Sequence, residues 1–175
     1  MKLKTRDIVY IGFIAALCAV ATTIRIEIPG GAMVHLGSAA LFTTSILFGG
    51  LYGGLGAAIG SALFDLFGGH TQYIVFSFFI KGIAGLIVGG MTAGYLPPSI
   101  TKPTASFTRI LLALIIGTIW TAFGYFLAWW FVLESVAVAA SKIQYSLITS
   151  TAGIVVAIIL TPKLQKVVRR LFTKN

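Results

Sequence analysis

The spacing of charged residues constrains this chain more than any other feature of its sequence. Residues 8–24 carry no charge, and neither do residues 28–64, 110–133 and 143–162. A helix that crosses the hydrocarbon core of a bilayer needs roughly 20 apolar residues, which such stretches supply. Only 10% of the chain is charged, whereas a soluble domain is about 25% charged. The sequence therefore predicts a polytopic integral membrane protein and excludes a soluble globular enzyme.

We expect a single all-α domain over residues 1–175, built as a bundle of six transmembrane helices. The uncharged stretch 28–64 is too long for one span, and its Gly-rich segment 49–54 predicts a tight reversal. Pro97-Pro98 should end the fourth span and open a polar loop over 97–106. Pro162 should end the sixth span, ahead of a basic amphipathic tail over about 163–175. The predicted spans are about 8–24, 36–49, 53–66, 72–95, 110–133 and 143–162.

The distribution of Lys and Arg predicts the orientation of the bundle. Cytoplasmic loops are enriched in these residues, so the basic ends place both termini in the cytoplasm. Only Arg25 and Lys142 then lie outside, and Lys81 lies within a span. An alternative treats the basic N-terminus and first apolar stretch as a signal peptide cleaved near Ala19-Val20-Ala21. That alternative would leave five spans. The residues expected inside are Lys2, Lys4, Arg6, Lys102, Arg109, Lys163, Lys166, Arg169, Arg170 and Lys174.

Several function classes lack the residues that they require. Cys18 is the only cysteine, and His35 and His70 are the only histidines, so we expect neither a disulfide framework nor a metal site. The sequence has no phosphate-binding G-x-x-x-x-G-K-[ST] loop and no nucleophile elbow. Basic residues gather at the ends and in one loop, which argues against nucleic-acid binding. We therefore predict a protein with no catalytic activity and no cofactor of its own.

Small residues recur at helical spacing in the first predicted span. Gly12 and Ala16 form one pair, and Ala15 and Ala19 form another. Such pairs let helix backbones approach closely within lipid. The same spacing in the third and fourth spans predicts internal packing. In the first span, the small residues face either the bundle or another protein.

Polar residues gather near the predicted outer face and form the main functional signal. Ionisable groups at membrane depth usually mark a site or a paired network. Lys81 lies nine residues into its span, roughly 13 Å along the helix. It faces a ligand cavity, pairs with Asp65, or extends to the membrane surface. The Gly-rich segment 25–35 is a connector or a lid, and Tyr125 and Thr149 also lie near this face. The predicted substrate-binding residues are His35, Asp65, His70, Gln72, Tyr73, Lys81, Trp129, Trp130, Glu134, Lys142, Gln144 and Tyr145.

The chain resembles the substrate-binding S components of energy-coupling factor (ECF) vitamin transporters, in the riboflavin-type and hydroxymethylpyrimidine-type branch. The similarity covers nearly the whole chain. The most specific stretches are His35-Leu-Gly-Ser38, Leu47-Phe-Gly-Gly50-Leu-Tyr-Gly-Gly54, Gly60-Ser61-Ala-Leu-Phe-Asp65 and Phe79-Ile-Lys81-Gly82.

The resemblance implies a location, partners and a mechanism. It implies a protein of the prokaryotic plasma membrane that binds a water-soluble vitamin from outside, and partners consisting of a membrane T component and two cytoplasmic ATPases. It also implies that the T component docks on the small residues of the first span, which are Gly12, Ala15, Ala16 and Ala19.

The mixture of aromatic, amide and charged groups favours a small hydroxylated heteroaromatic substrate, such as hydroxymethylpyrimidine or pyridoxine. Pantothenate is the first alternative, because Arg25, Lys81 and Lys142 offer partners for a carboxylate, and riboflavin is the next. Two more distant hypotheses are a membrane scaffold without ligand and a channel or carrier that acts alone.

Overall fold

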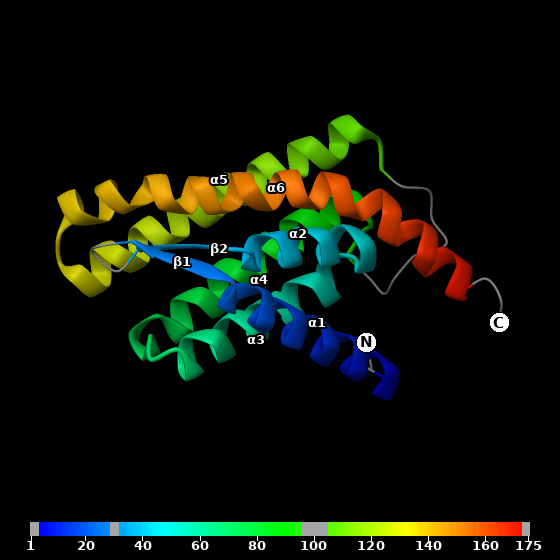
Figure 1. The fold of residues 1–175 in the computed structure, drawn as a ribbon, viewed down its shortest axis with the longest axis horizontal. Helices are drawn as coiled ribbons and strands as arrows, with labels where there is room; N and C mark the ends of the chain where they lie inside the picture. Colours follow the sequence, from blue (N-terminus) through cyan, green and yellow to red (C-terminus); the bar gives the residue numbers. More distant parts are fainter. Residues whose placement is uncertain (1–3, 29–31, 96–104, 173–175) are drawn as a thin grey trace.

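A computed structural model describes residues 4–28, 32–95 and 105–172 and shows six α-helices with one short hairpin (Figure 1). Five helices are long and apolar enough to cross a membrane, and α2 is a shorter apolar helix. The nearly all-helical architecture predicted from the sequence is therefore confirmed. The helices are α1 (Thr5–Thr23), α2 (Gly37–Phe48), α3 (Gly50–Phe67), α4 (Ile74–Thr92), α5 (Phe107–Leu133) and α6 (Val136–Phe172).

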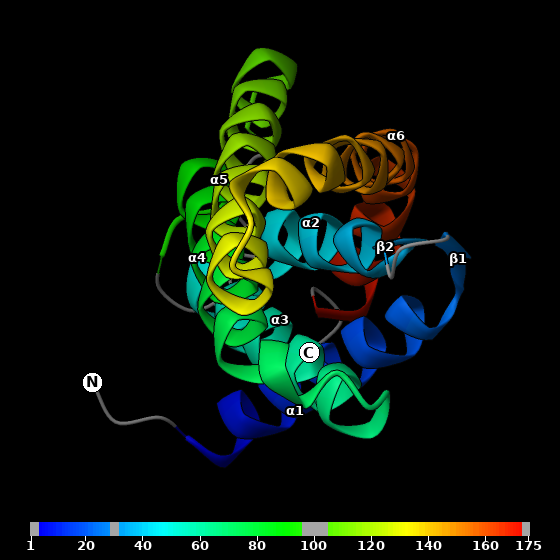
Figure 2. The ribbon, with the colours of Figure 1, turned by 90° about the vertical axis from the view of Figure 1, so that its left-hand side faces the viewer.

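Helix α2 occupies the centre of the bundle and contacts α1, α3, α4 and α6 (Figure 2). Its Leu41 and Phe42 are almost fully buried. Helices α5 and α6 run side by side along one flank, while α3 packs against α1 and α4 on the other (Figure 1). The N-terminal end of α1 and the C-terminal end of α6 lie at one end of the molecule, and the α5–α6 turn lies at the other.

Single residues produce the sharp reversals between neighbouring helices. Gly49 has a φ of 88° and alone separates α2 from α3. This left-handed conformation costs glycine little, because glycine has no Cβ to clash with the backbone. Glu134, with a φ of 54°, ends α5 in the left-handed helical region. The reversal predicted over 49–54 is thus present but occupies one residue.

Helices α3 and α4 pack with their backbones almost in contact. A Cβ on Gly85 would lie 2.7 Å from the Gly54 Cα, and a Cβ on Gly89 would meet the backbone of Gly50. Helices α1 and α3 approach similarly, because a Cβ on Gly60 would meet the carbonyl oxygen of Ala15. The small residues of α3 and α4 therefore serve the close internal packing that the sequence predicted, and Ala15 of α1 joins it.

Two features differ from the predictions. The segment predicted as an irregular outer loop contains an antiparallel hairpin, β1 (Arg25–Ile28) and β2 (Ala32–His35), which pairs Arg25 with His35 and Glu27 with Met33. The prediction that Pro162 ends the last helix is wrong, since α6 continues through it to Phe172. Proline removes one backbone donor, and the helix-favouring residues that follow sustain the remaining hydrogen bonds. The described residues do not include Pro97-Pro98, most of the predicted loop 97–106, or Pro29-Gly30-Gly31.

Candidate functional site

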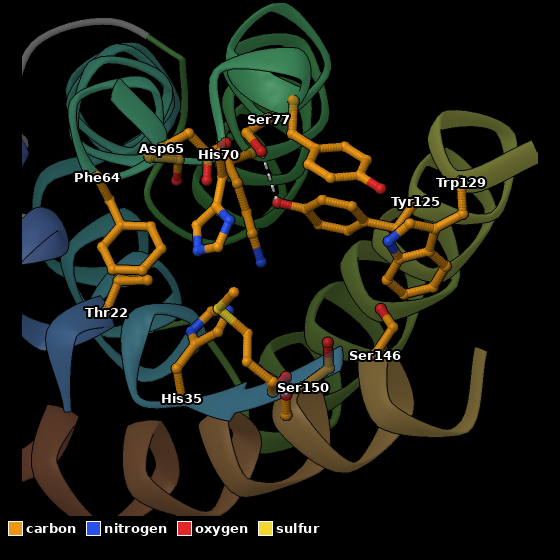
Figure 3. Close-up of a pocket in the computed structure, with 15 residues that line it drawn as sticks. Thr22, His35, Phe64, Asp65, His70, Ser77, Tyr125, Trp129, Ser146 and Ser150 are labelled. Carbon is orange, nitrogen blue, oxygen red and sulfur yellow. Dashed lines mark hydrogen bonds between the residues drawn. The ribbon is translucent and has the colours of Figure 1, made fainter. Parts of the chain in front are cut away.

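A cavity opens among the helix ends nearest the hairpin (Figure 3). Every helix except α2 contributes to its lining, together with β2 and the α3–α4 connection. The space between its walls is about 750 Å³, counting the open mouth. The lining residues are Thr22, Met33, His35, Ser61, Phe64, Asp65, His70, Tyr73, Ser77, Lys81, Tyr125, Trp129, Ser146, Thr149 and Ser150.

Aromatic rings lie on opposite sides of this cavity. Tyr125 and Trp129 stack on α5 with their ring centroids 5.6 Å apart and their planes inclined by 29°. On the other side, the Phe64 ring lies 6.1 Å from the His70 ring (Figure 3). Residues four apart on a helix share a face, which is why Tyr125 and Trp129 meet. Together the two sides present apolar surfaces suited to a flat ring.

Lys81 reaches the cavity from the middle of α4 and is only 4% exposed. Its Nζ donates a hydrogen bond to Ser38 Oγ at 3.1 Å and lies 5.3 Å from the centroid of the Tyr125 ring. The neighbouring backbone is braced, because Trp120 Nε1 donates to the carbonyl oxygen of Ile80 at 3.0 Å. Across the described residues, Lys81 and Asp65 form no ion pair. The alternative that these two groups pair directly is therefore not seen.

Several buried polar atoms of the lining lack a hydrogen-bonding partner. They are Asp65 Oδ2, His70 Nε2 and Ser150 Oγ. Buried polar atoms are nearly always satisfied by protein, water or ligand, so these three mark places where a bound molecule can complete the network. Ser77 lies between them and the aromatic wall, and its Oγ is 3.1 Å from the Tyr125 hydroxyl.

His35 enters the cavity from the end of β2 as a neutral imidazole. Its Nδ1 accepts a hydrogen bond from the Gly37 N–H at 3.1 Å, which places the remaining ring proton on Nε2. Burial lowers the pKa of His35 to about 3, and the positive charges of Lys81 and Arg25 contribute to this shift. His35 therefore offers the cavity a hydrogen-bond donor without a charge.

The hairpin that carries His35 is attached to the bundle on two sides. Thr149 Oγ1 on α6 donates to the carbonyl oxygen of Met33 at 3.4 Å. The Arg25 guanidinium lies 5.0 Å from the centroid of the Phe64 ring and pairs with Glu27 at 2.7 Å. The segment predicted as a connector or a lid therefore forms part of the cavity wall.

The structure brings half of the predicted substrate-binding residues to the cavity. Those in the lining are His35, Asp65, His70, Tyr73, Lys81 and Trp129. Gln72, Trp130, Glu134 and Gln144 are exposed outside it, Tyr145 is half-buried, and Lys142 is buried on α6 away from the lining.

The sequence analysis missed small hydroxyl residues and the apolar Met33 and Phe64. Helical spacing carried the missing signal in two places. Ser77 lies four residues before Lys81. Ser146 lies three residues before Thr149, which the sequence analysis had placed near this face, and four residues before Ser150. No such signal exists for Thr22 or Ser61, because serine and threonine are also common packing residues in membrane helices.

The small residues predicted to dock a partner divide between two faces of α1. Ala15 is buried against α3, at 3% exposure. Gly12 and Ala16 are exposed, and Ala19 is half-buried. A Cβ on Gly12 would meet no atom within 4 Å, so this face is open in the isolated chain.

A bundle of membrane-spanning helices with a mixed polar and aromatic cavity near one end defines a membrane-embedded binding protein. Comparison with known proteins gives the particular family. Residues 2–166 match the family model described as ECF-type riboflavin transporter, S component, and the chain belongs to this family. It is therefore a substrate-binding S component of an ECF-type vitamin transporter, a class of subunit that functions with a T component and ATPases.

Two further similarities accompany the family match. A protein of Pyrococcus woesei, described as an uncharacterized protein in the gap 3′ region, is 29% identical over 142 residues, which cover 81% of this chain and 88% of that protein. The solved structure of the S component of a bacterial ECF transporter superposes with a TM-score of 0.71 at 20% identity and covers 94% of this chain and 98% of that one. The second similarity supports the fold.

Proposed function

We propose that this chain captures a small hydroxylated heteroaromatic vitamin or precursor, of the hydroxymethylpyrimidine or pyridoxine type, and delivers it through a T component and two ATPases. The observation that carries the proposal is the pair of facing aromatic walls in one polar cavity. A flat ring fits between Phe64 with His70 and Tyr125 with Trp129. The serine and threonine hydroxyls of the floor and sides supply partners for hydroxymethyl groups.

Riboflavin is the second candidate, because the matching family is described by that vitamin. Its flat ring system and hydroxylated chain use the same two kinds of surface. Pantothenate has less support than the sequence suggested. Of the three cations considered for its carboxylate, Arg25 already pairs with Glu27 and Lys142 lies outside the cavity lining.

The orientation in the cell membrane is part of the proposal. With both termini in the cytoplasm, the cavity and the hairpin face outward, where an importer meets its substrate. The positive-inside distribution of Lys and Arg supports this arrangement. ATP hydrolysis is then the task of the partner subunits, which agrees with the absence of a phosphate-binding loop in the sequence. The exposed Gly12 and Ala16 face of α1 is the proposed T-component contact.

A ligand screen tests this function directly. The detergent-purified chain is heated with hydroxymethylpyrimidine, pyridoxine, riboflavin or pantothenate, and its unfolding temperature is recorded. We expect one heteroaromatic compound to raise it, since a ligand that binds only the folded state stabilises that state. Folded protein that responds to no vitamin would contradict the proposal and favour a scaffold. Uptake of vitamin into liposomes by this chain alone, without ATP, would instead support an autonomous carrier.

The aromatic wall provides a matched pair of variants for the same screen. Trp129→Ala removes one stacking surface. It should lower the affinity for the ligand found in the screen by about tenfold, which is within the range expected for an aromatic pair and its buried area. Phe123→Ala removes an aromatic ring from the same helix at a position that is 54% exposed and outside the lining. We expect that control to bind normally. Equal effects of the two substitutions would place the ligand elsewhere.

A further inference from the structure

The two formally charged side chains in the described cavity lining have opposite signs. Asp65 is 7% exposed and Lys81 is 4% exposed, so both are largely removed from water. They form no ion pair with each other, and each retains hydrogen-bonding capacity. One carboxylate oxygen of Asp65 has no partner, and the Lys81 ammonium, which can donate three hydrogen bonds, donates one of them to Ser38 Oγ.

The formal charges of Asp65 and Lys81 cancel each other. Desolvation lowers the pKa of His35 to about 3, so its ring adds no charge near neutral pH. At the rim, Arg25 and Glu27 neutralise each other at 2.7 Å. A ligand that enters this cavity therefore meets one free negative oxygen and one positive group, from α3 and α4 respectively.

A buried charge is stable only when opposite charge or hydrogen bonds compensate it. An anionic ligand would satisfy Lys81 but add a second negative charge near Asp65. A cationic ligand would do the reverse near Lys81. A compound without net charge that donates at one end and accepts at the other satisfies both groups at once.

We infer that the cavity selects a ring compound of zero net charge, held with a hydrogen-bond donor on Asp65 and an acceptor on Lys81. The inference rests on the proposed function and narrows its substrate class. Hydroxymethylpyrimidine, pyridoxine and riboflavin meet the condition as neutral or zwitterionic molecules. Pantothenate, pyridoxate and phosphorylated vitamins do not, because each carries net negative charge.

Matched ligand pairs that differ mainly in charge test the inference. They are pyridoxine with 4-pyridoxate, pantothenol with pantothenate, and riboflavin with its 5′-phosphate. Affinities are measured by titration calorimetry on the purified chain. For whichever pair binds, we expect the neutral member to bind at least tenfold tighter in the wild-type protein.

Charge-removing variants then separate ligand recognition from structural support. Asp65→Asn leaves Lys81 uncompensated and should reduce the preference for the neutral member at least tenfold. Lys81→Met should lower the affinity for the neutral member of the pair. It should lower the affinity for the anionic member even more. The double variant has no formal charge in the described lining and should regain a preference for the neutral member. Glu134→Gln makes the same carboxylate-to-amide change at an exposed position outside the lining and should leave the preference unchanged.

The possible results are distinct. Tighter binding of the anionic member by the wild-type chain overturns the inference while leaving a binding subunit in place. The inference is also overturned if Asp65→Asn and Lys81→Met change the affinities for both members of a pair by equal factors. A purely structural role of these residues predicts that outcome. Folded wild-type protein that binds no compound in any pair rejects the proposed function itself. A variant that fails to fold is replaced by the double variant, whose charges balance.

Discussion

At the scale of single residues, His35 shows how backbone geometry sets the chemistry of a side chain. Its Nδ1 is occupied by the Gly37 N–H, so a second proton on the ring would require that hydrogen bond to break. A Cβ on Gly37 would lie 2.9 Å from the same nitrogen, and this close approach needs a glycine. The ring is therefore fixed as a neutral donor through Nε2.

The lowered pKa of His35 predicts how stability depends on pH. The unfolded chain binds a proton at this residue near pH 6.5, whereas the folded chain does so near pH 3. Stability should therefore fall as the pH decreases below 6.5, by roughly 1–2 kcal/mol at pH 5. His35→Asn keeps an acceptor for the Gly37 N–H but does not titrate. Free energies of unfolding at pH 7 and pH 5 should show a smaller loss in the variant, and an equal loss would contradict the prediction.

At the scale of secondary-structure elements, α1 has one face that packs inside the bundle and another that is exposed. Ala15 contacts the backbone of α3, where Gly56 and Gly60 leave no room for a larger side chain. Ala16, the next residue along the chain, points away from the bundle and is exposed. Neighbouring alanines therefore serve different purposes, although their sequence contexts look alike.

This division sharpens the test of the docking surface. Ala16→Trp should prevent co-purification with the T component while leaving ligand affinity and thermal stability unchanged. Ala15→Trp should instead lower stability by more than about 2 kcal/mol, because it overpacks the α1–α3 contact. Both effects can be measured on purified protein and on the assembled complex. A T component that still binds Ala16→Trp would assign docking to another face.

At the scale of the whole molecule, the two flanks of the bundle meet around the cavity. Helices α1, α3 and α4 contribute the acid, the lysine, the Phe64 wall and half of the serine and threonine hydroxyls, while α5 and α6 contribute the stacked pair and the other half. The described ends of α1 and α6 lie together at the far end of the molecule from the hairpin (Figure 1). This arrangement suits a protein that receives ligand on one side and contacts cytoplasmic partners on the other.

Cysteine labelling in intact cells tests the orientation. The single native cysteine, Cys18, is 2% exposed and should react slowly, so the background is low. Ser141→Cys lies at an exposed position near the start of α6, and Lys163→Cys lies at an exposed position past its middle. A membrane-impermeant maleimide should label position 141 in intact cells and position 163 only after permeabilisation. The opposite pattern would invert the molecule, and equal labelling would exclude a crossing between the two sites.

Much of the fold was predictable because charges and glycines mark helix ends in a membrane protein. Predicted spans 36–49, 53–66 and 110–133 agree with α2, α3 and α5 to within a few residues. The error at Pro162 arose because a proline weakens a helix without ending it when good helix formers follow. The hairpin over Arg25–Ile28 and Ala32–His35 was not predicted, because the proline and glycines between its strands suggested irregular structure.

The lining residues of the cavity could be predicted only where burying the side chain costs considerable free energy. Lys81 and Asp65 were identified because a charged side chain at membrane depth is energetically costly and usually marks a functional site or an ion pair. Ser77, Ser146 and Ser150 were missed, because a serine hydroxyl can satisfy itself on the preceding turn and gives no such signal. Trp130 and Trp129 are adjacent and chemically identical, so only the helix rotation seen in the structure assigns Trp129 to the cavity.

The backbone contact between α3 and α4 has a consequence for which ligands the cavity accepts. Gly54, Gly85 and Gly89 bring the backbones of the two helices almost into contact, which leaves little room for one helix to slide along the other. Asp65 belongs to one helix and Lys81 to the other. The backbones that carry these two groups are therefore held close to one relative position, which favours a ligand whose donor and acceptor are spaced to match.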